Sequence, residues 1–406
     1  MVDKCQLTLA GALPAEGMRQ NRGMGIESGT VRIGVIGGGQ LARMMVPPAI
    51  NLGLRISVLA ETEGSSAERA ADVVGDYRDP ETVYAFAETV DVVTFDHEHV
   101  PQEILLELER RGVAVHPRPG ALQFAQDKIL MRQKLGELGV PVPAWAAVAD
   151  EAELQEFIAA NGGRVVVKTA RGGYDGKGVR VVSDATEVRD WFTTLAEDGH
   201  GGQLLAEELV DFTRELSQLV ARRPSGETRT WPVVETVQRD GVCAEVIAPA
   251  PVADPATLDE AARIGAVVAE GVAVTGVLAV EMFETRDGRV LVNELAMRPH
   301  NSGHFSIEGS VTSQFEQHLR AVADLPLGDT AMTAPAAVMV NVLGGPAEGP
   351  MPVRYAAALA AHPHAKFHSY DKLPRPGRKV GHVTVTGEEP AAVRAAAQAA
   401  AAAFDN

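Results

Sequence analysis

Short apolar runs alternate with amphipathic stretches over residues 31–116, and this alternation restricts the fold more than any other feature. Apolar runs of strand length occupy residues 31–37, 55–60, 90–95 and 113–116. Between the last two, residues 102–111 place Ile104, Leu105 and Leu108 on one face of a predicted helix. Strands that alternate with helices predict an α/β fold with a parallel, doubly wound sheet.

Ligands bind such sheets at the carboxyl ends of the strands, where this chain carries glycines and charged residues. The sequence GGGQLA at 37–42 follows the first strand, and Glu61 follows the second. This spacing fits the dinucleotide fingerprint G-x-G-x-x-G/A and favours a dinucleotide-dependent dehydrogenase. The alternative is a tight turn that holds some other phosphate or none, because any helix N-terminus attracts anions.

The composition limits the possible partners. Lys and Arg total 37 and Asp and Glu total 54, so the net charge is −17. A surface this acidic argues against nucleic acid and anionic lipid as partners, but small anionic ligands need only a local cluster of positive charge. Two cysteines in 406 residues favour a reducing, cytoplasmic location. The sequence has no apolar run long enough to span a membrane.

The chain length predicts two or three domains, at roughly 150 residues each. We expect residues 1–30 to be a disordered extension, with Met24 as an alternative start. A Rossmann-like domain is expected over 31–125 and a largely antiparallel domain over 126–330, with a turn at Asp240 and Gly241. A small β-rich domain over 331–406 ends in an alanine-rich helix.

A lysine and a glycine-rich loop predict a phosphate site. Residues 165–168 form an apolar strand that ends at Lys168, GGYDGKG follows at 172–178, and residues 179–182 form the next strand. Glycines let backbone N–H groups approach phosphate oxygens, and Lys168 and Lys177 add positive charge. This is not a Walker loop, because no GK[ST] opens a helix. The alternative is a plain mobile hairpin.

Two glutamates are expected to face each other across a hairpin. A two-residue turn at Asp287 and Gly288 would pair Glu281 with Glu294 on one face of the sheet. Opposed carboxylates repel unless a cation lies between them, and hard oxygen ligands suit Mg²⁺. The alternative is a solvated pair on an exposed face, which the apolar flanking residues disfavour.

Two further segments concentrate polar or basic residues. RPHNSGH at 298–304 brings together groups that bind a small oxyanion and stabilise developing charge. Five basic residues and one acidic residue lie between Lys366 and Lys379, a local reversal of sign in an acidic chain. Prolines and a glycine there favour a shaped phosphate pocket over an ordinary basic surface loop.

Together these residues resemble the ATP-grasp superfamily and, more closely, the N5-carboxyaminoimidazole ribonucleotide synthases. The resemblance extends from residue 31 to the C-terminal helix, and its most specific parts are GGGQLARMM (37–45), GGYDGKG (172–178), NELAMRPHNSGH (293–304), SQFEQHLRA (313–321) and YDKLPRPGRKVGH (370–382). It implies a Rossmann-like domain, a central ATP-grasp domain and a small C-terminal domain in a homodimer. It also implies an ATP- and Mg²⁺-dependent ligase that carboxylates 5-aminoimidazole ribonucleotide with bicarbonate, through carboxyphosphate, in purine biosynthesis.

The resemblance also implies roles for individual residues. ATP would be held by Lys128, Lys168, Gly173, Tyr174, Asp175, Gly176, Lys177, Gly178, Val179, Glu207, Glu208, Leu209, Val210, Glu215, Gln238, Asn293 and Glu294. The backbone of 207–210 would contact adenine, Glu215 the ribose hydroxyls, and Glu281 and Glu294 magnesium. Bicarbonate or carboxyphosphate would be bound by Arg298, His300, Asn301 and Ser302. The ribonucleotide would be bound by Gln40, Glu98, Lys372, Arg378 and Lys379, and the catalytic residues would be Asp175, Arg298 and Lys372.

The sequence departs from the family pattern at three positions. Met297 stands where proline is frequent, and His97 and His99 flank Glu98 where an aromatic residue and Asn are common.

Three rival functions remain beside this one. A formate-dependent glycinamide ribonucleotide transformylase would share the ATP-grasp fold, but 298–304 and 370–382 disfavour it. A dehydrogenase would use the glycine loop, and a non-catalytic nucleotide-binding protein would not need both glutamates. Transition-metal sites at 96–99 or 362–364 lack a second ligand cluster at usable spacing.

Overall fold

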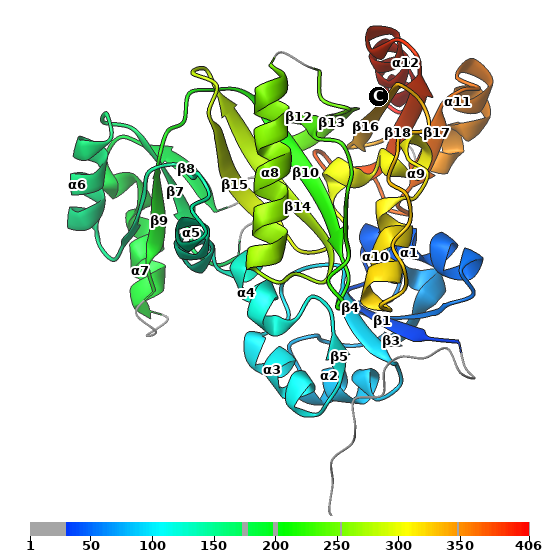
Figure 1. Ribbon diagram of the computed structural model, residues 1–406, viewed down its shortest axis with the longest axis horizontal. Coiled ribbons are helices and arrows are strands. Elements are labelled where there is room, and N and C mark those ends of the chain that lie inside the picture. Colours follow the sequence, from blue (N-terminus) through cyan, green and yellow to red (C-terminus); the bar gives the residue numbers. More distant parts are fainter. Residues whose placement is uncertain (1–29, 173–177, 198–201, 252–253, 347–348, 406) are drawn as a thin grey trace, which may run out of the picture.

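The computed structural model describes residues 30–405 except 173–177, 198–201, 252–253 and 347–348. The expected extension, residues 1–30, therefore lies outside the described residues except for Thr30. Figure 1 shows a small sheet at one side, a large sheet in the middle, and the N-terminal and C-terminal segments together at the other side.

The N-terminal segment forms the predicted parallel sheet. Its strand order is β3-β2-β1-β4-β5, and the strands are β1 (Arg32–Ile36), β2 (Arg55–Ala60), β3 (Ala71–Val74), β4 (Val92–Phe95) and β5 (Ala114–Val115). The helices are α1 (Gln40–Asn51), α2 (Pro80–Ala87), α3 (Gln102–Arg110) and α4 (Pro119–Gln126). The apolar face predicted for α3 is buried, whereas the short strand β3 was not predicted because only alternate residues of it are half-buried.

A small four-stranded sheet follows, in the order β6-β9-β7-β8. Its strands are β6 (Trp145–Val148), β7 (Val165–Thr169), β8 (Val179–Val182) and β9 (Leu204–Glu208), with helices α5 (Lys128–Glu137), α6 (Glu151–Ala160) and α7 (Arg189–Glu197) beside it. Strands β7 and β8 pair antiparallel with Lys168 opposite Val179. The predicted strand–loop–strand hairpin is therefore present, although most of its loop lies outside the described residues.

The large sheet has nine strands and extends from the central segment into the C-terminal one. Its strands are β10 (Phe212–Arg222), β11 (Thr228–Thr230), β12 (Val234–Arg239), β13 (Val242–Ala248), β14 (Gly276–Thr285), β15 (Val290–Ala296), β16 (Ala336–Leu343), β17 (Lys366–Ser369) and β18 (Lys379–Gly387). The helices of this part are α8 (Pro255–Gly271), α9 (Ser306–Gly309), α10 (Gln314–Val322), α11 (Tyr355–Ala361) and α12 (Pro390–Ala402). Because β16 pairs with β13, the C-terminal strands continue the central sheet rather than forming a sheet of their own.

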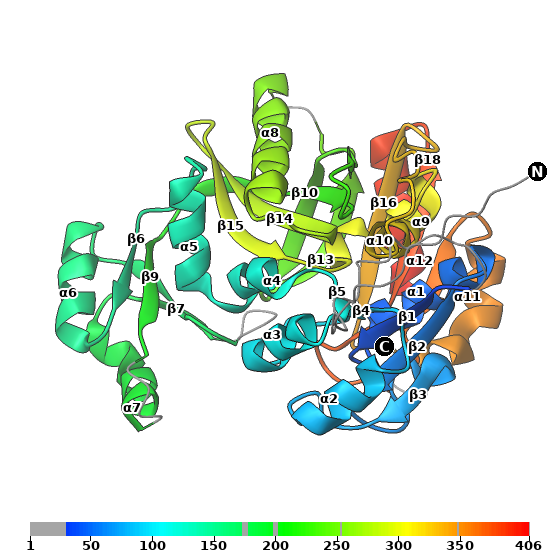
Figure 2. The same ribbon diagram turned by 60° about the horizontal axis from the view of Figure 1, so that its bottom comes forward.

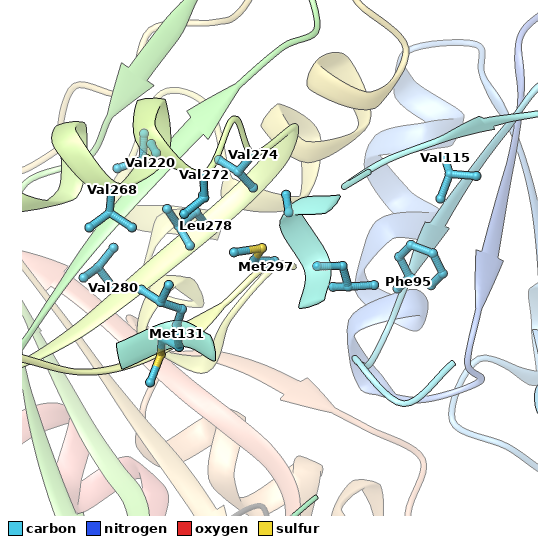
Figure 3. Close-up of a cluster of buried hydrophobic side chains, with 14 of the residues drawn as sticks. Phe95, Val115, Met131, Val220, Val268, Val272, Val274, Leu278, Val280 and Met297 are labelled. Atoms are coloured by element: carbon cyan, nitrogen blue, oxygen red, sulfur yellow. The ribbon is translucent and has the colours of Figure 1, made fainter. Parts of the chain in front are cut away.

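One apolar core joins the N-terminal and central segments. Figure 3 shows Phe95 and Val115 of the parallel sheet at one end of this cluster, and Val268 of α8 and Val280 of the large sheet at the other. Met297 lies between them and is fully buried. Met297, which replaces a frequent proline of the family, is thus held in place by packing, and the residues that follow it start from a fixed point.

Candidate active site

A cavity of about 950 Å³ lies where the three segments meet. Figure 2 shows the two ends of this region, with β7 and β9 on one side and β14 and β15 on the other. The predicted site residues that line the cavity are Glu98, Lys128, Lys168, Val179, Glu207, Glu208, Leu209, Val210, Glu215, Gln238, Glu281, Asn293, Glu294, Arg298, His300, Asn301 and Lys379. They come from segments more than 250 residues apart, and the fold brings them to one place.

Other predicted residues lie elsewhere. Gly173, Tyr174, Asp175, Gly176 and Lys177 lie outside the described residues, so the structure gives no position for them. Ser302 is fully buried behind the cavity wall. Gly178, Gln40, Lys372 and Arg378 are not part of the cavity lining either.

Lys168, one residue before the end of β7, is held by two acceptors. Its Nζ lies 2.7 Å from Glu207 Oε2 and donates to Asn293 Oδ1 at 2.9 Å. Burial raises the pKa of Glu207, but neighbouring cations outweigh burial and the net shift is downward. Glu207 was predicted to act through its backbone, whereas in the structure its buried side chain is a counter-ion of Lys168.

Lys128 is the second lysine of the cavity. Its Nζ donates to the carbonyl oxygen of Gly172 at 3.3 Å and lies 3.4 Å from Glu294 Oε1. The helix that carries it begins at the N-cap Asp127, whose carboxylate accepts two backbone N–H bonds. The cap therefore fixes the first residue of the helix, which is Lys128, at the cavity.

Glu281 and Glu294 are opposite each other, as predicted, although the turn between them is not the one expected. Thr285 pairs with Arg289, so the loop has three residues instead of two. Near the loop the register is therefore shifted by one residue, with Glu284 opposite Val290. A bulge at Asn293 adds one residue to β15 and restores the predicted pairing of the glutamates. The predicted pair is confirmed, and the predicted turn is wrong.

The carboxylate of Glu281 contacts the imidazole of His300, with 3.0 Å between Oε1 and Nε2. Burial raises the pKa of Glu281, but His300 and more distant cations lower it further, so its pKa is below the ordinary value. The other ring nitrogen, Nδ1, lies 2.9 Å from Ser302 Oγ, which in turn lies 2.8 Å from Ser217 Oγ. Ser302 therefore orients His300 and does not face the cavity itself.

Arg298 forms an ion pair with Glu98, which comes from the N-terminal segment. Arg298 Nε donates to Glu98 Oε2 at 2.8 Å, and both side chains are largely buried. Burial raises the pKa of Glu98, but Arg298 outweighs burial and the net shift is downward. Glu98 also lines the cavity, and its predicted contact with the ribonucleotide stays a prediction.

Gln40 and Lys372 meet at the junction of the N-terminal and C-terminal segments. The Nζ of Lys372 donates to Gln40 Oε1, and Arg378 Nη1 donates to the carbonyl oxygen of Leu373 at 3.1 Å. Lys379 begins β18 and lines the cavity. The basic segment 370–382 thus extends from the carboxyl end of β1 to the cavity.

Two aromatic residues of the cavity wall were not predicted. Phe212 and Phe283 stack with 4.7 Å between ring centroids. Phe283 lies two residues after Glu281 on β14, so strand alternation was a signal that could have placed it on the same face.

Known proteins match the chain along most of its length. Family models match residues 30–126 (ribonucleotide synthetase preATP-grasp domain), 133–315 (ATP-grasp domain) and 337–396 (phosphoribosylaminoimidazole carboxylase C-terminal domain). The N5-carboxyaminoimidazole ribonucleotide synthase of Mycobacterium tuberculosis is 48% identical over 373 residues, which are 91% of this chain and 86% of that protein. The chain belongs to the N5-carboxyaminoimidazole ribonucleotide synthase family.

Solved structures of this family share the fold. An N5-carboxyaminoimidazole ribonucleotide synthetase in complex with ADP has a TM-score of 0.83 at 34% identity, over 91% of this chain and 96% of that one. The Aspergillus clavatus enzyme in complex with ADP and 5-aminoimidazole ribonucleotide has a TM-score of 0.82 at 31% identity, over 93% of this chain and 99% of that one. The predicted fold class and the predicted ATP-grasp ligase activity are both confirmed.

The dehydrogenase alternative is wrong for this family, and the glycine loop shows why. The backbone N–H of Gly38 donates to Glu61 Oε2 at 3.1 Å, and that of Ala42 donates to Asp96 Oδ1 at 2.9 Å. His97 also pairs with Glu61 and holds the pKa of that carboxyl at about 2. The donors that would bind a dinucleotide pyrophosphate therefore already bind the protein's own carboxylates.

Within the described part of the chain, no group of three or more His, Cys, Asp or Glu residues is arranged to hold a metal ion. Glu281 and Glu294 supply two carboxylates, which together with phosphate oxygens suit Mg²⁺. The donor set therefore fits a cation that binds with the nucleotide. Among the helices that the structure describes, none has the length and apolar character needed to cross a membrane.

Proposed function

We propose that this chain joins bicarbonate to the exocyclic amine of 5-aminoimidazole ribonucleotide, while ATP is converted to ADP and phosphate. The observation that carries this proposal is the geometry of one cavity. Lys168 contacts Asn293, the residue before Glu294. Glu294 is opposite Glu281, and Glu281 contacts His300, with Arg298 in the same cavity wall. Family membership supports the same reaction, because the relatives are named N5-carboxyaminoimidazole ribonucleotide synthases.

ATP is placed with its phosphates towards Lys128 and Lys168. Strand β9 ends at Glu208, and Leu209 and Val210 follow it. The backbone of these three residues is available to the adenine edge, next to the stacked pair Phe212 and Phe283. Glu215 and Gln238 are hydrogen-bonded neighbours on the adjacent strands and are placed at the ribose hydroxyls. Burial raises the pKa of Glu215, which favours a carboxyl that shares protons with hydroxyl groups. The loop residues Gly173 to Val179, with Asp175, are assigned to ATP and to the amine by family resemblance alone.

Glu281, Glu294 and the side chain of Asn293 are placed around Mg²⁺. When bound, Mg²⁺ neutralises the phosphate oxygens and polarises the γ-phosphorus towards attack. The imidazole of His300 fixes one oxygen of Glu281, and Lys128 lies beside Glu294. Each carboxylate therefore has a fixed orientation before the nucleotide enters.

Bicarbonate is placed between Arg298, His300 and Asn301. One of its oxygens attacks the γ-phosphorus, the bond from that phosphorus to the β–γ bridging oxygen breaks, and ADP leaves from the resulting carboxyphosphate. In one route the amine attacks the carboxyl carbon of carboxyphosphate, and phosphate leaves. In the other, carboxyphosphate first breaks down to phosphate and carbon dioxide, and the amine attacks the carbon dioxide. In both routes the amine then loses a proton. Arg298 stabilises the developing charge, and Glu98 keeps its guanidinium in place.

The ribonucleotide is placed against Gln40, Lys372, Arg378 and Lys379, near the carboxyl end of β1. Lys372 is assigned to orient the amine and the new carboxylate. Glu98 is assigned to hold Arg298, and its predicted contact with the ribonucleotide stays a prediction.

Further expectations also stand as proposals. Domain boundaries at 31–125, 126–330 and 331–406 are proposed, and the matched segments 30–126, 133–315 and 337–396 support them. A homodimer, a cytoplasmic location, and the lack of nucleic-acid or membrane partners are proposed from the family and from the acidic composition.

The test is phosphate release from MgATP by the purified full-length chain in bicarbonate buffer. Release should require 5-aminoimidazole ribonucleotide and should stop when carbon dioxide and bicarbonate are removed. Release driven instead by formate and glycinamide ribonucleotide would move the assignment to the transformylase reaction. Labelled bicarbonate should appear in the product as an acid-labile carbamate.

A further inference from the structure

Arg132 is a fully buried arginine that the proposed reaction does not use. It lies four residues after Lys128 on α5, so both side chains project from the same side of the helix. Lys128 reaches the cavity, whereas Arg132 lies beneath it, with a side-chain exposure of 0%. A buried guanidinium needs partners, and the identity of its partners indicates what it does.

Its partners are two elements of the ATP site. Arg132 Nε donates to Glu207 Oε1, and Nη2 donates to the backbone carbonyl of Asn293 at 2.8 Å. The other oxygen of Glu207 pairs with Lys168 Nζ, which also donates to Asn293 Oδ1. The four residues form a closed ring of contacts from α5, β9, β7 and β15.

The contact with Asn293 acts on the register of the carboxylates. Asn293 is the extra residue of the β15 bulge, and that bulge places Glu294 opposite Glu281. The extra residue of a bulge disturbs the strand ladder, so its carbonyl benefits from a donor outside the sheet. Arg132 supplies that donor at the residue directly before Glu294.

The contact with Glu207 acts on the charge of Lys168. Without Arg132, Glu207 would place its whole negative charge on Lys168 and weaken the field that Lys168 presents to phosphate. With Arg132 present, two cations share one carboxylate, and a net positive charge remains at the cavity.

Stability alone does not explain an arginine here. In the described part of the chain, Arg132 Nη1 is buried without a hydrogen-bond partner. Apolar residues often replace buried ion pairs without loss of stability, so the ion pair of Arg132 with Glu207 is weak evidence for a purely stabilising role.

We propose that Arg132 is a positioning residue that fixes both the ATP-binding lysine, Lys168, and the metal-binding carboxylate, Glu294. This inference rests on the proposed function only for the identity of the nucleotide. It predicts that loss of Arg132 weakens binding of MgADP and raises the Mg²⁺ concentration needed for that binding. The predicted effect on MgADP affinity is about 10- to 100-fold, the usual range for groups that orient metal or phosphate ligands.

The experiment measures MgADP binding by calorimetry at several Mg²⁺ concentrations, with thermal unfolding in parallel. Arg132→Met should bind MgADP about 10- to 100-fold more weakly. Arg132→Lys keeps the charge but lacks the planar fork that reaches two acceptors, so it should recover only part of the affinity. It also serves as the second variant if Arg132→Met does not fold.

Arg214→Met is the matched control. Arg214 is also largely buried and pairs with Glu284 and Glu235, but it contacts neither Lys168 nor Asn293. It should lose thermal stability and keep the wild-type MgADP affinity. Wild-type affinity in Arg132→Met or in Arg132→Lys would overturn the proposal, and so would an equal loss of affinity in Arg214→Met. Because MgADP binding needs no ribonucleotide, wild-type protein that binds MgADP but fails to carboxylate would contradict the proposed function and leave this inference standing.

Discussion

Glu294→Gln should separate activity from stability, because the carboxylate that it removes is opposed by another one. Directly opposed strand residues have Cβ atoms about 4.5–5.5 Å apart, and two full charges at about that distance near a protein surface repel by about 3 kcal/mol. The side chain of Glu294 is 44% exposed, so solvent reduces this repulsion to about 1 kcal/mol. Its contact with Lys128 at 3.4 Å contributes a favourable energy of about the same size.

The two effects nearly cancel in the folded protein without ligand. We therefore expect the free energy of unfolding of Glu294→Gln to stay within about 1 kcal/mol of wild type. Activity should fall by at least about 100-fold, which corresponds to about 2.7 kcal/mol of transition-state stabilisation. The loss arises because a neutral amide binds Mg²⁺ less tightly than a carboxylate.

The assay is ribonucleotide-dependent phosphate release at saturating MgATP, with urea unfolding of the same samples. Glu235→Gln is the matched control, because Glu235 is a half-buried carboxylate of the same sheet that does not line the cavity. Full activity of Glu294→Gln would refute the inference that the opposed carboxylates bind the metal. A loss of activity in Glu235→Gln as large as in Glu294→Gln would show that the effect is not local.

Three other perturbations test the geometry around the cavity. In Gly39→Ala the new Cβ would overlap Asp96 Oδ2, so the hydrogen bond from the backbone N–H of Ala42 to Asp96 should break and the free energy of unfolding should fall by about 1–3 kcal/mol in urea titrations. Glu98→Gln leaves Arg298 buried without its counter-ion, which should cost about 3 kcal/mol of stability, and a double variant with Arg298→Gln should recover part of that loss in a mutant cycle. Burial lowers the pKa of His318 from 6.5 to about 3, so between these values the unfolded state binds a proton that the folded state does not. Stability should therefore fall as the pH drops below about 6.5, by up to about 1.4 kcal/mol per pH unit from this group, and His318→Gln should remove that part of the slope in unfolding measured from pH 7 to 5.

Local patterns in the sequence determined much of the architecture. The apolar runs located four strands of the parallel sheet, and the spacing of Ile104, Leu105 and Leu108 located the buried face of α3. Asp240 and Gly241 form the predicted two-residue turn, with positive φ at both positions. These features depend on residues that are neighbours along the chain, so the sequence itself contains their physical cause.

The two Asp-Gly turns show where this reasoning stops. The same dipeptide at Asp287 and Gly288 lies in a three-residue loop, and the predicted glutamate pairing survives because a bulge at Asn293 compensates. A bulge depends on what the neighbouring elements offer its unpaired backbone groups, here a guanidinium from α5. Nothing within the hairpin sequence carries that information.

The partners of the charged side chains were decided by the tertiary structure alone. Glu98 and Arg298 are 200 residues apart, and Gln40 and Lys372 are 332 residues apart. The sequence showed which residues carry charge, and the family resemblance implied that they share a site. Which carboxylate neutralises which cation depends on the packing of distant strands, because an ion pair in a buried site is set by distances of a few ångströms. For that reason the sequence determined the chemistry available to this protein, and only the fold decided that Glu98 is the carboxylate that pairs with Arg298.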